Sequence, residues 1–437
     1  MNSDVVRLPV DYEPGSFYIA MVGLGTFNGS QQPFKNYYLM IDIGSDQTWI
    51  QCEGFTKVFH QDMPLYHWRS SSTYRHVPCN THPLCKGDKC NADGQCTYKV
   101  RYASGSVTSG IVAEEKFTLG YNTGDLERIL GLGPGEWSFL NQLGAAGEGK
   151  FSYCLEMFND RIRGSDIYLR FGADATIGGV FQTTPTVVPL FRTKLHYYLN
   201  LEDISVANKR VRFPKGTFEV KSRKEGGIII DSGAPFSTMY KDHFDRVADL
   251  VKSHFRELRV EYISTYNSFD ACFRLPGRFD ITHYPSITLH FQQANYVISD
   301  YKANFVIIFA KTIYLGFFRM DKNKPAFILG AMQQGNKHIL YNVMDQSLSF
   351  ATEYCELDGE EHGLFVGGIG SDAVCHDNVL RSGHVGCLCS LCSKVHHLSF
   401  IAASVNLSSA NPKSVRLMTQ RLLAGYSNCY STNSERE

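Results

Sequence analysis

Two aspartates, Asp42 and Asp231, occupy matching places in the two halves of this chain. Each ends a short apolar run and is followed two residues later by a glycine, and each half has an apolar pair before a glycine further along. The matching segments are 38–45 with 129–131, and 228–234 with 328–330. A single Asp-x-Gly step is explained at least as well by a turn. Its repetition indicates a duplicated chain, which can bring the two carboxylates together.

Such a pair of carboxylates supports acid–base chemistry. Two carboxyl groups about 3 Å apart cannot both ionise, so they share one proton. The ionised member takes a proton from a water that attacks a peptide carbonyl. The protonated member polarises that carbonyl, and the proton then reaches the leaving nitrogen. This reaction needs no metal and no cofactor, and we predict Asp42 and Asp231 as its catalytic residues.

Composition narrows the functions that the chain can have. Its 437 residues are enough for two or three domains. Lys plus Arg and Asp plus Glu both number 43, so no basic field exists to hold nucleic acid or an anionic membrane. No apolar run approaches the roughly 18 residues that cross a bilayer, and the best, 306–318, is interrupted by Lys311. We therefore expect no nucleic-acid partner and no membrane.

Short segments rich in β-branched and aromatic residues, separated by turn residues, predict antiparallel sheet in both halves. These segments are 17–23, 37–43, 97–102, 197–206, 227–231, 286–291 and 327–330. One amphipathic helix is predicted over 240–258, where apolar residues recur with helical spacing. The predicted fold class is all-β, mainly antiparallel, with a few short helices.

Cysteine usage bears on the compartment and on metal binding. Thirteen cysteines favour an oxidising compartment, although residues 1–14 show no apolar signal segment. Cys79, Cys85, Cys90 and Cys96 have C-x5-C-x4-C-x5-C spacing, which suits zinc poorly and favours disulfides, whose connectivity stays open.

Residues 15–355 resemble the pepsin-like aspartic proteases, most closely their plant nepenthesin-like branch. The segments that carry the resemblance are 42–49, 231–233, 101–106, 151–155 and 330–336. The resemblance implies a bilobal fold whose cleft binds an extended polypeptide substrate, in an extracellular or vacuolar monomer working at acidic pH. It divides the chain into an N-terminal segment (1–14), two lobes (15–189 and 190–355) and a poorly ordered extension (356–437).

The resemblance also assigns roles to single residues. Tyr102 matches the flap tyrosine that closes over bound peptide. The residues expected beside the substrate are Tyr102, Ser104, Gly105, Gly44 and Gly233, and those expected to support the carboxylates are Ser45, Ser232 and Trp49. The disulfide candidates are Cys52, Cys79, Cys85, Cys90, Cys96, Cys154 and Cys355. Asn28 and Asn406 begin sequons for glycosylation.

Two departures from the family pattern touch the carboxylates. Ile43 stands where the family has a threonine that joins a hydrogen-bond network beneath them, and partners left unpaired there cost about 1–3 kcal/mol. Ala234 replaces the hydroxyl residue expected to donate to Asp231. Losing a donor raises the pKa of a carboxyl group. We therefore expect an acidic optimum that is shifted upward relative to typical relatives.

Other departures concern the framework. Ile308 stands where the family has the disulfide partner of Cys272, so we expect Cys272 to stay outside the disulfides. Between 119–120 and 129–131 the chain is shorter than the family's and lacks a strand. Without that strand, we expect exposed sheet edges in the first lobe.

Two alternatives to a protease remain. One is a catalytically weak or inactive binding protein on the same fold, similar to relatives that inhibit plant-cell-wall-degrading glycosidases. The other is a metal module in the extension, which holds Cys375, Cys387, Cys389, Cys392 and Cys429 near several histidines. Because that cluster is irregular and its flanks are rich in Ser and Gly, we predict an extension without a metal site.

Overall fold

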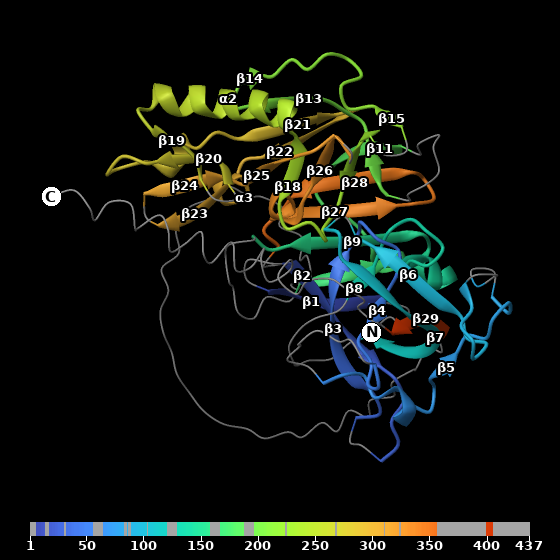
Figure 1. Cartoon of the computed structure of the whole chain (residues 1–437). Coiled ribbons are helices and arrows are strands. Elements are labelled where there is room, and N and C mark those ends of the chain that lie inside the picture. Colours follow the sequence, from blue (N-terminus) through green and yellow to red (C-terminus); the bar gives the residue numbers. More distant parts are fainter. Residues whose placement is uncertain are drawn as a thin grey trace, which may run out of the picture.

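A computed structural model describes the protein. The described residues are 6–13, 17–29, 32–55, 64–82, 85, 89–102, 104–119, 129–157, 167–187, 196–222, 225–266, 269–309, 311–322, 325–355 and 399–404. The all-β, bilobal fold predicted from the sequence is confirmed, with the two lobes one above the other in Figure 1.

Strands make up most of both lobes. Those of the first half are β1 (Val6–Glu13), β2 (Phe17–Leu24), β3 (Lys35–Asp42), β4 (Trp49–Ile50), β5 (Arg75–His76), β6 (Thr97–Arg101), β7 (Val107–Leu119), β8 (Ile129–Gly131), β9 (Lys150–Leu155), β10 (Tyr168–Phe171) and β11 (Gln182–Val187). Those that follow are β12 (Tyr198–Leu199), β13 (Leu201–Val206), β14 (Lys209–Arg210), β15 (Val220–Ser222), β16 (Glu225–Gly226), β17 (Ile228–Ile230), β18 (Ser237–Tyr240), β19 (Glu261–Tyr266), β20 (Phe269–Arg274), β21 (Ile287–Phe291), β22 (Ala294–Ile298), β23 (Phe305–Phe309), β24 (Thr312–Leu315), β25 (Phe317–Met320), β26 (Phe327–Leu329), β27 (Lys337–Asn342), β28 (Ser347–Thr352) and β29 (Ser399–Ser404).

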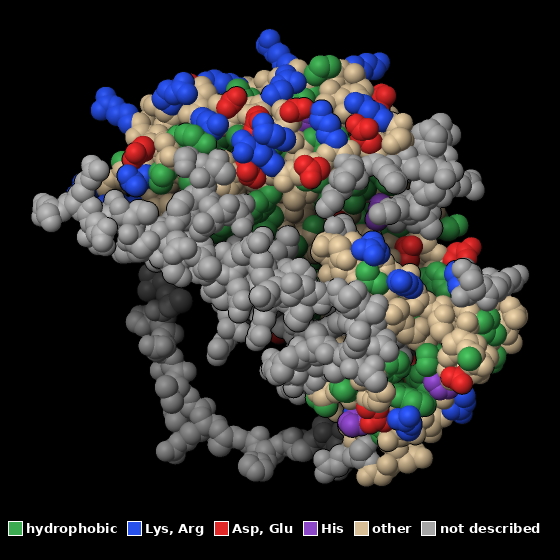
Figure 2. All heavy atoms as spheres, in the orientation of Figure 1, with side chains coloured by type: hydrophobic (Ala, Val, Ile, Leu, Met, Phe, Trp, Pro, Cys, Tyr) green, Lys and Arg blue, Asp and Glu red, His purple; other side chains and the backbone are tan. Residues whose placement is uncertain are grey.

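Helices are few and mostly short. The α-helices are α1 (Phe139–Gln142), α2 (Lys241–Glu257) and α3 (Tyr301–Asn304), and the 3₁₀ turns are η1 (Trp68–Ser70), η3 (Gly144–Gly147), η4 (Gly172–Asp174), η5 (Ile281–His283) and η6 (Ala331–Gln334). The predicted amphipathic helix is confirmed as α2, which buries Phe244, Val247, Ala248, Val251 and Phe255. On the face shown in Figure 2, acidic and basic side chains lie intermixed over the second lobe, to which α2 belongs. Within the described residues, no helix is both long and apolar enough to cross a membrane.

One antiparallel sheet joins the two lobes. Its strands run in the order β1-β10-β9-β27-β28-β11, and the lobes meet where β9 pairs with β27 (Figure 1). Aromatic side chains pack along this junction, with the rings of Phe151 and Tyr341 stacked 4.3 Å apart. The hydroxyl groups of Tyr153 and Tyr341 lie 2.9 Å apart in the same buried layer. This shared sheet holds the lobes in a fixed relation.

The duplication predicted from the sequence corresponds to two equivalent strand arrangements. In the first lobe β3 pairs in parallel with β8, and in the second β17 pairs in parallel with β26. A further strand lies antiparallel to the second member of each pair, β4 beside β8 and β18 beside β26. Because the aspartates end or directly follow β3 and β17, the repeat places both at the same end of matching strands.

Two strands come from segments that we expected to lie outside the lobes. β1 belongs to the N-terminal segment and pairs with β10 and β2. β29 belongs to the extension and pairs with β7 and β4. The sheet edge that we expected to be exposed is therefore covered along these residues, because a strand distant in the sequence occupies it. The lobe boundaries themselves stay a prediction.

Candidate active site

The two aspartates predicted from the repeat lie together. Asp42 is the last residue of β3 and is buried, and Asp231 directly follows β17. Their carboxyl groups hydrogen-bond to each other. The backbone N–H of Gly44 donates to Oδ1 of Asp42 at 2.9 Å and to Oδ1 of Asp231 at 3.1 Å. The first turn therefore contacts both carboxyl groups.

The glycines Gly44 and Gly233 make this close approach possible. The backbone N–H of Gly233 donates to Oδ1 of Asp231 at 2.9 Å. A Cβ atom on Gly44 would collide with the carboxyl group of Asp231, and a Cβ atom on Gly233 would collide with that of Asp42. Each glycine thus faces the aspartate of the opposite lobe, so any side chain at either position would push the pair apart.

Different surroundings give the two carboxyl groups different proton affinities. Burial raises the pKa of Asp42, but the hydroxyl of Ser45 donates to Oδ2 of Asp42 and opposes that rise. Burial, followed by the negative charge of Asp42, raises the pKa of Asp231 to about 7. Ala234, at the position matching Ser45, has no hydroxyl group to donate. These surroundings favour the ionised form at Asp42 more than at Asp231.

Beneath the carboxyl groups, the residues after the two aspartates differ in what they offer to the opposite lobe. The hydroxyl of Ser232 is buried and donates to the carbonyl of Ile41 at 2.6 Å, across the lobe boundary. Ile43, at the matching place in the first lobe, is fully buried in the apolar core. Because an isoleucine cannot donate, the reciprocal hydrogen bond is absent between these described residues.

The flap tyrosine predicted from the sequence connects to the carboxyl pair. Tyr102 lies in the hairpin between β6 and β7, where Ser104 and Gly105 are exposed. The indole N–H of Trp49 donates to the Tyr102 hydroxyl at 2.6 Å, and that hydroxyl also hydrogen-bonds with Ser45. Burial and then the charge of Asp42 raise the pKa of Tyr102, which keeps its hydroxyl protonated.

A third carboxyl group lies nearby, and the sequence reasoning gave it no role. Burial raises the pKa of Asp46, and the charge of Asp42 adds to the rise. The backbone N–H of Gly135 donates to Oδ1 of Asp46 at 2.8 Å. A Cβ atom on Gly131, Gly133 or Gly135 would collide with Asp46. Two features of the sequence could have indicated this contact: an acidic residue four positions after Asp42, and glycines at every second position from 131 to 135.

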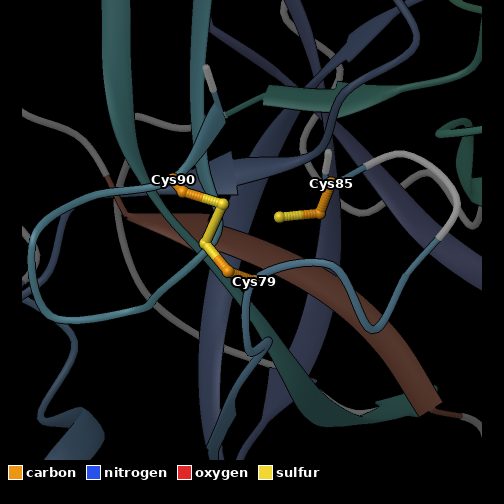
Figure 3. A group of neighbouring side chains, drawn as sticks. All are labelled: Cys79, Cys85 and Cys90. Carbon is orange, nitrogen blue, oxygen red and sulfur yellow. A yellow bond between two sulfur atoms is a disulfide. The ribbon is translucent and has the colours of Figure 1, made fainter. Parts of the chain in front are cut away.

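The cysteine-rich insertion is held by two disulfides. They are Cys79–Cys90 and Cys85–Cys96, and Figure 3 shows the first of them with Cys85 beside it. Cys85 and Cys96 are buried in one apolar cluster with Trp49. The insertion therefore packs against the residue that holds the flap tyrosine.

A third disulfide, Cys154–Cys355, ties the end of the second lobe to β9. Cys52, the seventh disulfide candidate, is buried in the core and takes part in none of the three disulfides found between described residues, which corrects that prediction. Cys272, which we expected to stay outside the disulfides, is buried and belongs to none of the three.

Groups of metal-ligand type in the described part of the chain involve these same disulfides. One group is Cys79, Cys85 and Cys90, and the other is Cys154 with His338 and Glu353. Every cysteine in them is bonded to another cysteine, and a metal requires the thiolate. The cysteines and histidines of the extension, and the sequon residue Asn406, lie outside the described residues. Asn28 is described and lies exposed in a turn.

Comparisons with known proteins identify a family and relatives of this chain. Two protein-family profiles, described as xylanase inhibitor N-terminal and xylanase inhibitor C-terminal, match residues 18–173 and 196–352. Aspartyl protease AED1 of Arabidopsis thaliana is 31% identical over 77% of this chain and 72% of its own length. Aspartic proteinase nepenthesin-2 of Nepenthes gracilis is 27% identical over 81% of each chain.

Solved structures show the same fold at lower identity. The protein named edgp has a TM-score of 0.65 and 18% identity, covering 81% of this chain and 96% of its own. Basic 7S globulin from soybean has a TM-score of 0.60 and 17% identity, covering 82% of this chain and 97% of its own.

Proposed function

The chain belongs to the pepsin-like aspartic protease family, in its plant nepenthesin-like branch, and on this premise we propose that it is an aspartic endopeptidase. The mutual hydrogen bond between the carboxyl groups of Asp42 and Asp231 carries this proposal. Two carboxyl groups in such contact retain one proton between them, which is the state that peptide hydrolysis by this chemistry requires.

We infer a role for each member of the pair from its surroundings. Asp42, stabilised as the anion by the Ser45 hydroxyl, takes a proton from a water held between the carboxyl groups. Asp231, which keeps its proton to about pH 7, donates to the carbonyl oxygen of the substrate. Tyr102 closes over an extended polypeptide, and its protonated hydroxyl stays linked to Ser45. The three disulfides suit an oxidising compartment, so we place the protein outside the cell or in the vacuole.

A cleavage assay tests this function. The purified full chain is mixed with a quenched apolar peptide between pH 3 and pH 7, alongside the variant Asp42→Asn. We expect cleavage that pepstatin blocks and that Asp42→Asn abolishes. A folded protein that cleaves no peptide at any of these pH values would contradict the proposal.

A second candidate function is a binding protein that inhibits a glycosidase. It is favoured by the description of the two matching profiles as xylanase inhibitor domains. The apolar residues Ile43 and Ala234 beside the carboxyl pair favour it as well, because they remove polar groups that catalysis would use. Titration of the protein against a xylanase separates the two functions. Equal inhibition by the wild type and by Asp42→Asn, without peptide cleavage, would support the binding protein.

A further inference from the structure

The second lobe shows which strand should lie beside the one that follows the aspartate turn. In that lobe β18 follows the turn, and it pairs in parallel with β25, from Ser237 opposite Phe317 to Tyr240 opposite Met320. On its other side β18 pairs antiparallel with β26. In the chain, β25 comes just before β26. The strand after the turn is therefore enclosed between two neighbours.

The first lobe has the same arrangement but takes one strand from elsewhere. β4 follows the first turn and pairs antiparallel with β8, with Trp49 opposite Ile129. By the pattern of the second lobe, a strand just before β8 should lie parallel to β4. That stretch, residues 120–128, lies outside the described part of the chain. The parallel neighbour of β4 is β29, with Ala403 opposite Trp49 and Ser404 opposite Ile50.

β29 is paired on both of its edges. Besides β4, it lies antiparallel to β7, from Ser399 opposite Lys116 to Ala403 opposite Val112. Figure 1 shows β29, in red, between β4 and β7. A strand enclosed in this way satisfies the backbone N–H and C=O groups that both neighbours would otherwise expose. It occupies in the first lobe the position that β25 occupies in the second.

We propose that the groove between β4 and β7 is a strand-binding site whose occupant is residues 399–404 of the same chain. Addition of an extended segment to a sheet edge is a general mode of recognition, in which backbone hydrogen bonds supply the affinity. The connecting residues 356–398 are long enough to reach the first lobe, because an extended chain spans about 3.3 Å per residue. The C-terminal extension thus supplies a strand that the described residues just before β8 do not supply.

This strand also bears on the candidate active site through Trp49. The backbone of Trp49 pairs with Ala403, and its indole donates to the hydroxyl of Tyr102. Binding of residues 399–404 therefore positions β4 and, with it, the partner of the flap tyrosine. The proposal concerns folding and does not require that the protein cleave peptides.

Hydrogen exchange in two full-chain variants tests the proposal. Ala403→Pro removes an N–H from a strand paired on both sides, where proline is not tolerated, whereas Ala410→Pro changes the extension outside that strand. The N–H of Val112 donates to Cys96 on the other side of β7, so the N–H groups of 113 and 115 face β29. We expect the amides of 113, 115 and 49–50 to exchange about 10-fold faster or more in Ala403→Pro than in Ala410→Pro. Amides of β17 and β26 should exchange alike in both. Equal exchange at 113 and 115 in the two variants would overturn the proposal.

A synthetic peptide of residues 397–406 provides a rescue. Added to the Ala403→Pro variant, it should fill the groove and restore slow exchange at 113, 115 and 49–50. The same peptide with proline in place of Ala403 should have no effect. Equal rescue by both peptides, or rescue by neither, would contradict a specific strand site.

A cysteine pair tests the register even if the proline variant does not fold. Ala113 and Ala402 lie opposite each other in β7 and β29. In Ala113→Cys with Ala402→Cys we expect mild oxidation to link positions 113 and 402 within one chain, as detected by mass spectrometry. Ala113→Cys with Ala410→Cys is the matched control. Equal linking in both pairs, or links only between two copies of the chain, would overturn the assignment.

Discussion

The two lobes differ in the side chain that they place three residues after the aspartate, Ser45 in the first lobe and Ala234 in the second. Asp42 accepts a hydrogen bond from the hydroxyl of Ser45, whereas the residue at the matching position after Asp231 is Ala234, which has no hydroxyl group. Each also accepts from backbone N–H groups, including that of Gly44, which contacts both. The repeated strands decide where the carboxyl groups lie, while their different hydrogen-bond donors contribute to their different proton affinities.

Beneath the pair, the polar residue belongs to the second lobe and the apolar residue to the first, which is the reverse of Ser45 and Ala234. The second lobe provides Ser232, which donates to the carbonyl of Ile41, and the first lobe provides the apolar Ile43. Each lobe therefore keeps one polar support and lacks the other. The backbone pairing of β9 with β27 joins the lobes without using any of these side chains.

The largest expected effect comes from removing either carboxylate. Asp42→Asn and Asp231→Asn should each lower kcat/KM by about 10³-fold or more, because each removes one acid–base partner. The exposed Asp249→Asn serves as the control for the amide substitution. Steady-state kinetics on the quenched peptide measures the effect. If either Asp42→Asn or Asp231→Asn kept wild-type activity, the two carboxyl groups would not both be required for catalysis.

The pair itself was predictable because each aspartate lies in a local motif, and the helix α2 was predictable from its apolar spacing. Strand β29 was not predictable, because the sequence of its six residues, 399–404, does not indicate that they pair with β7. Asp46 was missed because its role depends on glycines that are distant in the sequence. Pairings over long sequence separations therefore account for what the sequence did not reveal.

The second-largest effect is expected in the pH dependence of stability, which should show the raised pKa of Asp231. The pKa of Asp231 is raised from 3.8 to about 7 in the folded state. A carboxyl group with a raised pKa contributes stability that is fully present below pH 3.8 and is lost as the pH rises through about 7. The free energy of unfolding of the wild type should therefore fall relative to that of Asp231→Asn between pH 4 and pH 8, at about 1.4 kcal/mol per pKa unit.

Urea unfolding at several pH values measures this difference, and Asp249→Asn again provides the control. A wild type whose stability runs parallel to that of Asp231→Asn over this range would show that Asp231 ionises as an ordinary carboxyl group.

Exchanging the hydroxyl group between the halves sharpens the comparison. Ala234→Thr supplies a donor to Asp231, which lowers its pKa and moves the alkaline limb of the pH–rate profile below about 7. A shift of one unit would lower the rate at pH 7 roughly five-fold. Ser45→Ala removes a donor from Asp42, which raises its pKa and moves the acidic limb to higher pH. An unshifted profile in Ala234→Thr would count against the assigned cause.

The smallest effect is expected beneath the pair. Ser232→Ala removes the hydrogen bond to Ile41 and should lower the free energy of unfolding by about 1 kcal/mol. Ile43→Val, at the matching position, should cost about 0.5–1.5 kcal/mol through lost packing and leave the pH–rate profile unchanged. Urea unfolding compares the two variants. If Ser232→Ala unfolds at the same urea concentration as the wild type, the hydrogen bond across the lobes contributes nothing to stability.

The central claim is that Asp42 and Asp231 hold one proton between them. A ¹³C NMR titration of the aspartate carboxyl carbons, with Asp42→Asn and Asp231→Asn used for assignment, measures this directly. The account predicts two separate steps for the pair, with the second proton leaving near pH 7 from Asp231. Loss of both protons in one step near pH 3.8 would contradict it.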